Sequence, residues 1–485
     1  MTSREWLAVA VPLAPAAGAV AVAVAPRRSI TAIGLGAAGI SGLLALVLAG
    51  VAIARAGDPT SGDWLVVDAT AGLFVAVIGV VGLASALTSP VYLGLARSEL
   101  VRPERGERLY YGTFLAFWAV LVAVPLAGNL GIAWLLVEAT TAASALLVGF
   151  SGRATALEAG WKYLVLTTLG LGFALLGIVL IAPNVQGGLG ALSWGSLASL
   201  DTGSDQLTVA FVLVLAGLAA KIGWAPVHNW LPDAHSEAPP PISALLSSAL
   251  LPAVLVVAWR TDRALTPAVG EDLAHGVLVG FGLVSLAVAV PFLWRALAWK
   301  RLLAYSSLEH MGVLALGFAF ANPLAMAGVV VHVAGHAIAK ALGFYAATPL
   351  LTHVPAAGGR AATGVGRTCP PLGASMGISL ATLAGLPPSP LFASEVLIVA
   401  GGFAAGRTWE AAAAAILLAL GFLGLGHALL ETIAGRARRR APGSPSGLRT
   451  VVALTVCAAA ALLTLTALAP WLPGSELVEA MLDVA

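Results

Sequence analysis

Long apolar runs separated by short polar stretches extend over the whole sequence. A helix that spans a bilayer needs about 20 apolar residues. Counting runs of that length predicts fourteen membrane spans, so the pattern indicates an all-α integral membrane protein. Their approximate limits are 5–25, 29–54, 65–88, 109–127, 129–150, 158–182, 206–229, 240–260, 270–295, 301–320, 323–348, 372–404, 409–433 and 448–470.

The seventh span combines a charge with a helix break. In FVLVLAGLAAKIGWAPVHNW, residues 211–230, an apolar run leads into Lys221, and Pro226 follows where it interrupts the helix. A charged lysine at membrane depth costs roughly 3 kcal/mol or more. Broken helices at that depth must face protein or water. We therefore predict that this stretch forms part of an ion path; alternatively, Lys221 lies near a helix end and extends to the membrane surface.

The twelfth span is interrupted in the same way. LAGLPPSPLFASE, residues 383–395, carries three prolines that a continuous helix does not accommodate, and Glu395 follows them. The helix-breaking prolines of this span are Pro387, Pro388 and Pro390. Spans seven and twelve are five apart, so they run in opposite directions, which predicts two inverted five-helix repeats made of spans 4–8 and 9–13. The predicted divisions are 1–108, 109–260, 270–433 and 434–485.

Basic residues predict the orientation of the chain. The loops after odd-numbered spans hold seventeen lysines and arginines, and the opposite side holds five, which places the odd-numbered loops in the cytoplasm and both termini outside. The seventeen are Arg27, Arg28, Arg97, Arg102, Arg105, Arg108, Arg153, Arg295, Lys300, Arg301, Arg360, Arg367, Arg436, Arg438, Arg439, Arg440 and Arg449.

Composition supports the membrane assignment. The chain is 59% hydrophobic and 10% charged, whereas soluble domains carry about 25% charged residues. Its two cysteines, Cys369 and Cys457, form no metal-binding or disulfide pattern, and no dinucleotide or phosphate-binding signature is present. We therefore expect no cofactor, no metal site and no catalytic residues in this chain. The apolar start resembles a signal peptide, but its acidic residue favours a retained first helix.

Ionisable residues recur inside the predicted spans, where they are costly and usually functional. His332, His336 and Lys340 are spaced four residues apart and line one helix face, and histidine can both give and accept a proton. We predict a proton-transfer row of Glu138, Lys221, His332, His336, Lys340 and Glu395. Secondary candidates are Lys162, His228, His310, His427 and Glu431.

Several ionisable residues have a plainer alternative. Glu309 and His310 alternatively lie near the cytoplasmic interface. Two pairs spaced four apart alternatively form local helix-end pairs: Glu158 with Lys162, and His427 with Glu431. The loop LPDAHSEAPPP alternates acid and histidine like a set of metal ligands, but its prolines favour a structural role for Asp233, His235 and Glu237.

Four blocks of the sequence resemble one family. They are NLGIAWLLVEATTAASALLVGF (129–150), KIGWAPVHNWLPDAHSEAPPPISALLSSALL (221–251), KRLLAYSSLEHMGVLALG (300–317) and HVAGHAIAKALGFY (332–345). They resemble the antiporter-like subunits of respiratory complex I, Mrp antiporters and group 4 membrane-bound hydrogenases, most of all the hydrogenase-4/formate hydrogenlyase branch. The resemblance implies fourteen helices with two inverted repeats.

The resemblance also implies residue roles. Glu138 matches the fifth-helix glutamate, Lys221 the seventh-helix lysine that pairs with it, Lys340 the lysine of the later histidine-containing helix, and Glu395 the charged residue of the second broken helix. Complex I members often carry an eighth-helix lysine where this chain reads LLPAV around Pro252. Either His275 or water bridges the halves instead. The lateral helix of the largest complex I subunit is also not expected.

Together these observations predict a proton-translocating subunit of a larger redox complex, with the redox centres in other membrane and soluble subunits. Charge arriving at one end would loosen the Glu138–Lys221 pairing and release a proton toward the second half. The alternatives are a cation/proton antiporter subunit of Mrp type and an energising subunit for inorganic-carbon uptake. No nucleic-acid partner is expected, and the chain is expected in the plasma membrane.

Overall fold

The computed structural model describes residues 2–96, 103–185, 187, 192–200, 204–295, 297–353, 363–436 and 447–483. Elements up to the first helix break are α1 (Ser3–Val24), η1 (Arg27–Ser29), α2 (Ile30–Ala54), β1 (Thr60–Ser61), β2 (Val66–Val67), α3 (Ala69–Ala96), α4 (Pro103–Ala123), η2 (Val124–Leu126), α5 (Leu130–Val148), α6 (Ala154–Ile181), η3 (Ala182–Asn184), α7 (Trp194–Ala198) and α8 (Asp205–Ile222). The rest are α9 (Trp230–Glu237), α10 (Pro240–Leu245), η5 (Leu246–Leu250), α11 (Leu251–Val269), α12 (Glu271–Leu293), α13 (Trp299–Phe320), α14 (Pro323–His353), α15 (Val365–Thr368), α16 (Pro370–Leu383), α17 (Pro390–Ala404), α18 (Thr408–Ala434), α19 (Leu448–Leu468), η6 (Ala469–Trp471) and α20 (Glu476–Leu482).

The predicted all-α membrane fold is confirmed. In the described part of the chain, 13 helices are long and apolar enough to span a membrane, and each matches a predicted span. The remaining predicted span, 372–404, is divided between α16 and α17, with residues 384–389 between them. The only strands among the described residues are β1 and β2, which have two residues each and pair in antiparallel fashion. The sequence analysis did not predict them. The division into repeats stays a prediction.

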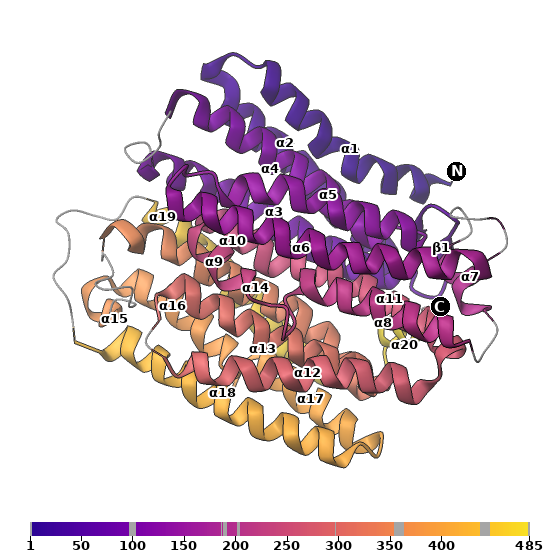
Figure 1. Ribbon diagram of the computed structural model, residues 1–485. Helices are drawn as coiled ribbons and strands as arrows, with labels where there is room; N and C mark the ends of the chain where they lie inside the picture. The colour runs from indigo at the N-terminus through magenta and orange to yellow at the C-terminus, as the bar shows by residue number, and fades with distance from the viewer. Residues whose placement is uncertain are drawn as a thin grey trace.

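The helices run roughly side by side in one elongated bundle, with the N- and C-termini at the same end (Figure 1). The most apolar 18-residue stretch of the α10–η5–α11 span is completely buried. The corresponding stretches of α13 and α14 are 89% and 83% buried. By contrast, α18 and α19 are only 22% and 17% buried over theirs. The bundle therefore has a central layer of buried helices, and this layer carries His310, His332, His336 and Lys340 of the predicted ionisable residues.

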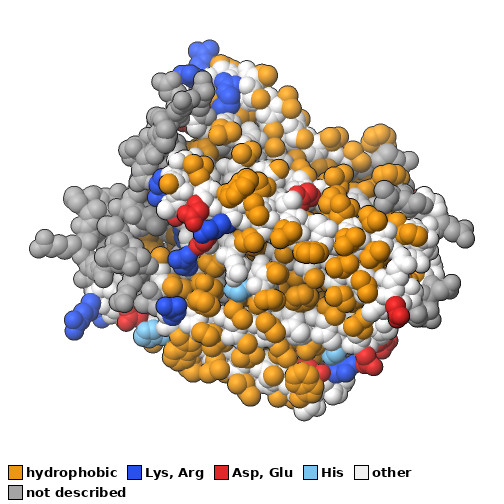
Figure 2. Space-filling model, viewed as in Figure 1, with side chains coloured by type: hydrophobic (Ala, Val, Ile, Leu, Met, Phe, Trp, Pro, Cys, Tyr) orange, Lys and Arg blue, Asp and Glu red, His pale blue; other side chains and the backbone are white. Residues whose placement is uncertain are grey.

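The outside of the bundle suits a lipid environment. Large apolar side chains are exposed on many helices, and Figure 2 shows a face dominated by hydrophobic side chains, with most charged groups toward two opposite sides. Lipid tails favour such a surface because burying apolar groups away from water is the main driving force for membrane insertion. The chain is a multi-pass membrane protein.

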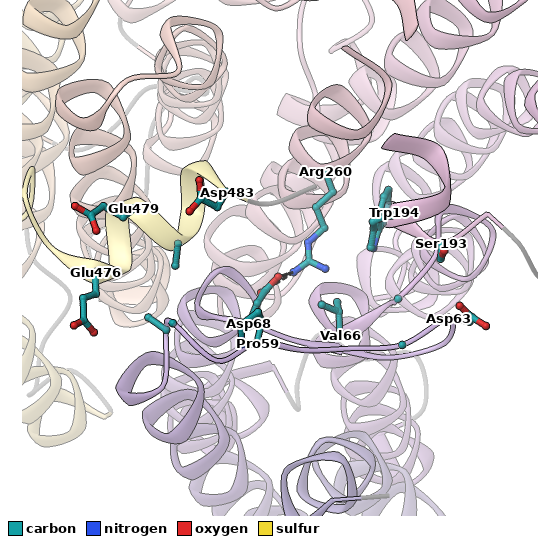
Figure 3. Close-up of a pocket in the computed structure, with 16 residues that line it drawn as sticks. Pro59, Asp63, Val66, Asp68, Ser193, Trp194, Arg260, Glu476, Glu479 and Asp483 are labelled. Atoms are coloured by element: carbon teal, nitrogen blue, oxygen red, sulfur yellow. Dashed lines mark hydrogen bonds and ion pairs between the residues drawn. The ribbon is translucent and has the colours of Figure 1, made fainter. Parts of the chain in front are cut away.

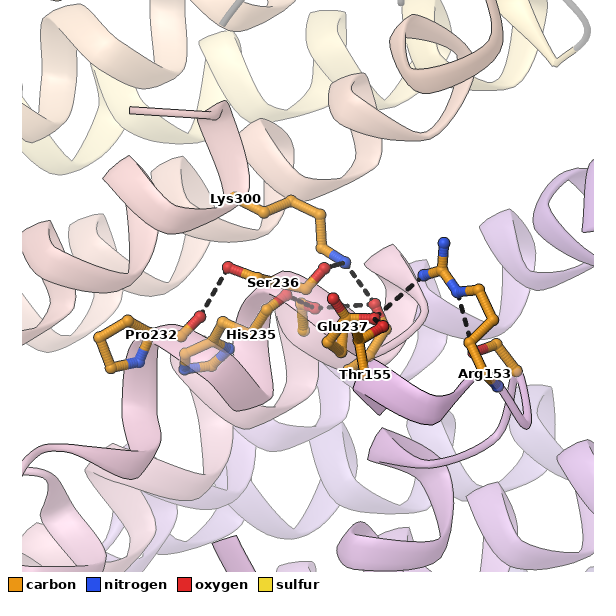
Figure 4. A network of polar contacts seen from close by, with 10 residues as sticks. Arg153, Thr155, Pro232, His235, Ser236, Glu237 and Lys300 are labelled. Carbon is orange, nitrogen blue, oxygen red and sulfur yellow. Dashed lines mark hydrogen bonds and ion pairs between the residues drawn. The ribbon is translucent and has the colours of Figure 1, made fainter. Parts of the chain in front are cut away.

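At one end of the bundle lie three segments that the orientation prediction assigns to the same side of the membrane. The loop after α5, the short helix α9 and the start of α13 meet in a polar network (Figure 4), where Arg153 pairs with Glu237 at 3.1 Å. Lys300 donates to the backbone carbonyls of Ser236 and Ala238 at 2.7 and 2.5 Å. All three loops follow odd-numbered spans, so their common end agrees with the predicted alternation. The arginines at 97, 102, 360 and 438–440 lie outside the described residues.

Candidate functional site

The first helix break fixes where Lys221 lies. Helix α8 ends at Ile222, and Gly223 adopts the left-handed conformation, with φ of 82°, that glycine accommodates best. Lys221 is thus in the last turn of α8, where the negative end of the helix dipole favours a cation. The irregular backbone that follows is satisfied by the other half of the chain: Ser285 of α12 accepts from the Ala225 backbone N–H at 3.0 Å.

Lys221 is completely buried and bonded to hydroxyl groups. Its Nζ donates to Thr141 Oγ1 on α5 at 2.7 Å and to the Tyr163 hydroxyl on α6 at 2.5 Å. The Tyr163 hydroxyl also bonds Ser144 Oγ of α5 at 2.7 Å. The alternative in which Lys221 extends to the membrane surface is therefore wrong. A lysine held only by neutral oxygens depends on more distant charges for its balance, which makes it sensitive to them.

Glu138 is the acid that the sequence analysis paired with Lys221. It is half-buried on α5, one turn before Thr141, and its Oε1 accepts from Thr168 of α6 at 2.9 Å. Its Oε2 is buried without a partner among the described residues. The two groups interact electrostatically, but the hydrogen bonds of Lys221 go to Thr141 and Tyr163. The site is thus a lysine and a carboxylate that bond to different side chains of α5 and α6, and not a direct ion pair.

The second buried lysine lies in the middle of α14. Lys340 donates to the backbone carbonyl of Leu303 at 2.7 Å and to Ser306 Oγ, both on α13. His332 and His336 lie one and two turns earlier on the same helix, and all three side chains are fully buried. The predicted row along one helix face is therefore present in the core, and it faces α13 rather than solvent.

The row connects to histidine and serine side chains of two neighbouring helices. His310 Nδ1 of α13 lies 3.1 Å from His332 Nε2, and His332 Nδ1 lies 2.9 Å from Ser394 Oγ of α17. The His336 ring centroid lies 5.1 Å from that of His310, and both ring nitrogens of His336 are buried without partners. Glu309 is also buried, and it interacts electrostatically with Lys340. The interfacial alternative for Glu309 and His310 is therefore wrong.

The second helix break brings Glu395 to this cluster. Helix α16 ends at Leu383, and α17 restarts with Ser389 as its cap, whose Oγ accepts from the Phe392 backbone N–H at 3.2 Å. Gly385 has φ of 68°, a left-handed conformation that favours glycine, and a Cβ there would lie 2.7 Å from Glu395 Oε2, so the absence of a side chain lets the carboxylate lie against the break. The ligand atoms of Glu395, His310 and His332 all lie within 4.8 Å of one another.

A sequence model for "NADH:quinone oxidoreductase/Mrp antiporter, TM" matches residues 127–421, which include both buried lysines and both helix breaks. The chain belongs to this family. The resemblance recognised in the four sequence blocks is thereby confirmed. Residue roles within the family stay predictions for this member.

Two sequence relatives and one solved structure show which kinds of protein this chain is similar to. The hydrogenase-4 component F homolog of Methylacidiphilum infernorum (isolate V4) is 31% identical over 377 residues, covering 76% of this chain and 78% of the relative. NADH-quinone oxidoreductase subunit N of Desulforudis audaxviator (strain MP104C) is 29% identical over 362 residues, covering 72% and 68%. A chain of the membrane-bound sulfane sulfur reductase, an archaeal respiratory membrane complex, superimposes with a TM-score of 0.86 at 22% identity, over 99% and 98% of the two chains. This last likeness shows the fold.

Between Lys221 and Lys340 lies a polar zone that the sequence analysis did not predict. The π-helical turn η5 is buried near the position expected for an eighth-helix lysine. Its Ser247 Oγ lies 2.7 Å from Ser307 Oγ, and Ser307 donates to the same Leu303 carbonyl as Lys340. His235 of α9 is fully buried, neither of its ring nitrogens has a partner among the described residues, and its ring stacks 5.6 Å from Phe344 of α14.

The sequence analysis favoured a structural role for Asp233, His235 and Glu237. Asp233 and Glu237 do have such a role. Asp233 pairs with Arg301 and Lys162, and Glu237 with Arg153, so the three alternating residues of this loop do not converge as metal ligands. Lys162 also pairs with Glu158 at 2.6 Å, which confirms the helix-end alternative for that pair. His275 lies elsewhere: its Nε2 is 3.6 Å from Glu410 and its Nδ1 is 3.0 Å from the Ala319 carbonyl.

The remaining candidates lie toward the outside of the bundle. The first break is exposed at Pro226 and half-buried at His228, the second is exposed at Pro387 and Pro388, and Pro390 is buried as the first residue of α17. His427 and Glu431 are exposed on α18. Within the described part of the chain none of these side chains bonds to the central cluster, so the cluster contains His310 but not the other secondary candidates.

At the end opposite the Arg153 network, even-numbered loops and α20 surround a cavity of about 600 Å³ (Figure 3). Arg260, which is 2% exposed, donates to both carboxylate oxygens of Asp68 at 2.8 and 2.9 Å. Other acids line the cavity: Asp63, Glu476, Glu479 and Asp483. Water and cations therefore have an acidic recess at this end of the bundle.

Proposed function

We propose that this chain is a proton-translocating membrane subunit of a multi-subunit, redox-driven complex. The observation that carries the proposal is the succession of buried ionisable and hydroxyl groups that extends from one helix break to the other. Buried charges in a membrane protein are expensive, and they usually mark ion pathways. The names of the two sequence relatives, a hydrogenase-4 component homolog and a quinone oxidoreductase subunit, support a redox-driven complex over an Mrp-type antiporter or a carbon-uptake complex.

The proposed route begins at Glu138 and Lys221. It continues past His235 and the Ser247–Ser307 pair, where hydroxyl groups and internal water carry the proton toward Lys340. Hydroxyls suit this task because each both donates and accepts a hydrogen bond. This zone replaces the eighth-helix lysine that the sequence lacks.

The second part of the route is the histidine cluster. From Lys340 the proton passes to His336, to the bonded pair His310 and His332, and then to Glu395 at the second break. Histidine can hold a proton on one ring nitrogen and release it from the other, which suits transfer along a row. The 3.1 Å separation of His310 and His332 is a hydrogen-bond distance, so this step needs no intervening water.

The driving interaction is electrostatic. A unit charge brought to about 10 Å from the Lys221 ammonium changes its energy by roughly 1.7 kcal/mol at an effective dielectric constant of 20. A change of about 1.4 kcal/mol shifts a proton equilibrium tenfold. Charge movement in a neighbouring subunit can therefore release the Lys221 proton without any redox chemistry in this chain. Electrons stay in cofactors held by other subunits.

The expected setting is the plasma membrane, with both termini on the non-cytoplasmic side and membrane subunits as direct neighbours. The exposed break at Pro226 and Val227 supports neighbours of this kind. Irregular backbone facing lipid would leave polar groups unsatisfied, so another protein surface is expected to cover it. Soluble redox subunits would join through those neighbours.

The test is the variant Lys221→Ala in the complete complex. Proton pumping into membrane vesicles, driven by NADH or hydrogen, is expected to fall to background while subunit composition on native gels stays unchanged. Cys457→Ser, on an exposed position of α19, is the matched control and should pump normally. Full pumping by assembled Lys221→Ala complexes would overturn the proposal.

The subunits that co-purify with the chain decide between the redox proposal and its rival. Iron–sulfur and nickel–iron hydrogenase-like or dehydrogenase partners, identified by mass spectrometry, support the redox proposal. Small antiporter subunits without redox partners would contradict it and favour a cation/proton antiporter of Mrp type.

A further inference from the structure

The grouping of His310, His332 and Glu395 has the composition of a metal site. The three side chains come from different helices, α13, α14 and α17, and their ligand atoms lie within 4.8 Å of one another. Two imidazole nitrogens and a carboxylate oxygen are the donors that zinc accepts in proteins. Such a grouping could not be seen in the sequence, because the three residues are far apart along the chain.

The geometry is close to that of a tetrahedral zinc site. Zinc–nitrogen bonds of about 2.05 Å place two ligand nitrogens roughly 3.3 Å apart. His310 Nδ1 and His332 Nε2 are 3.1 Å apart, so a zinc ion can replace the shared proton with little movement of either ring. Glu395 has to approach further. It lies directly after the break, on the half-buried side of α17, where side-chain rotation is available.

A supporting shell is also present. His332 Nδ1 is bonded to Ser394 Oγ at 2.9 Å, which orients the ring and leaves Nε2 for an ion. His336, whose buried ring nitrogens have no partner among the described residues, has its ring centroid 5.1 Å from that of His310 and would have to move closer to serve as a fourth ligand. The nearby ionisable groups are Glu309, Glu395 and Lys340, and a carboxyl group that gives up its proton when the ion binds can balance the charge of a divalent cation.

We propose that this cluster is a reversible binding site for one zinc ion, and that the bound ion blocks proton transfer. The ligands are His310, His332 and Glu395, with His336 as the fourth. On binding, the proton between His310 and His332 moves to His310 Nε2, which has no partner among the described residues, and the ion occupies the nitrogens through which a proton would pass. The binding site stands on its own geometry, whereas the block rests on the proposed function.

Binding is tested on the full complex, purified with a tag that contains no histidine. The complex is titrated with zinc alone, and bound metal is counted by mass spectrometry and by zinc K-edge absorption. We expect one buried zinc per chain with imidazole scattering, lost in both His332→Asn and Glu395→Gln. Ser394→Ala, which keeps every ligand, should weaken binding about tenfold because it removes a supporting hydrogen bond.

His275→Asn is the control, because half-buried His275 lies 3.6 Å from the buried carboxylate of Glu410 and so forms another histidine–carboxylate pair away from the cluster. It should bind zinc like the wild type. A complex that binds no zinc, or zinc binding that persists in both His332→Asn and Glu395→Gln, overturns the site. Loss of binding in His275→Asn alone would place the ion at the other pair and also overturn it.

The block has its own readout. Micromolar zinc should stop proton pumping by the wild type at the concentration that fills the site, and Ser394→Ala should need about tenfold more. If zinc fills the site while pumping continues, the block is overturned and the site stands. If Lys221→Ala pumps normally, the proposed function fails, and the zinc count is unaffected.

Discussion

Lys221 and Lys340, the two completely buried lysines among the described residues, show two ways to keep a charge inside a membrane bundle. Lys221 lies at the end of α8, where the helix dipole favours it, and it is held by the hydroxyls of Thr141 and Tyr163. Lys340 lies in the middle of α14 without help from a helix end. It relies on the Leu303 carbonyl and Ser306 of α13.

The surroundings differ even more than the direct partners. Near Lys221 the only predicted acid is the half-buried Glu138, whereas three histidines and two glutamates surround the second site. At a site with one exchangeable proton, an outside charge that shifts the proton equilibrium decides directly how often that proton is released. A site with several can pass protons on and keep working when one member is lost. We therefore expect the first site to act as the switch and the second as the relay.

The largest effect on this contrast is expected from removing two histidines of the relay. The double variant His332→Asn/His336→Asn should lower proton pumping about 100-fold, because positioned proton-transfer groups typically contribute that much. His336→Asn alone should lower it only severalfold, since the His310–His332 pair remains. Pumping rates at equal redox turnover provide the measurement. Equal, complete loss in the single variant would contradict the redundancy of the second site.

A smaller effect is expected at the switch from Tyr163→Phe. It removes one of two hydroxyl acceptors of Lys221 and the partner of Ser144, so two buried groups lose a bond. Each such loss costs about 1–3 kcal/mol, and we expect a lower thermal unfolding temperature of the complex together with slower pumping. Thr464→Val, on an exposed face of α19, is the control, since its hydroxyl bonds only its own helix. Normal stability and pumping in Tyr163→Phe would mean that hydroxyls do not hold Lys221.

The smallest effect is expected between the two sites. Ser247→Ala breaks the 2.7 Å contact with Ser307, worth about 0.5–1.5 kcal/mol, so pumping should slow by only a few-fold. The comparison with Ser307→Ala, which also removes one of the donors that share the Leu303 carbonyl with Lys340, separates the contact itself from its effect on Lys340. If neither variant slows pumping, the proton does not pass through η5.

The helices and breaks could be predicted because their causes are local. Apolar length sets the spans, proline interrupts the helix whatever its neighbours are, and a lysine in an apolar run must be buried in protein or reach water. The shared face of His332, His336 and Lys340 follows from helical spacing alone. Each of these features is visible in the structure.

The partners of those groups could not be predicted, because they depend on tertiary packing. Thr141, Tyr163 and Ser306 are ordinary membrane-helix residues until packing places them against a lysine. His235 looked like a loop residue, since prolines surround it, but α9 carries it into the core. The π-helical turn at η5 has no sequence signal, and the grouping of Glu395 with His310 requires the packing of α13 against α17.

The central claim is that Lys221 works by giving up a proton and not merely by being charged. Lys221→Arg tests this most directly, because arginine keeps the positive charge and does not release its proton in proteins. In complexes shown to be assembled, with electron transfer measured in parallel, we predict that redox turnover continues and that protons pumped per electron fall to background. Pumping at the wild-type ratio would contradict the account.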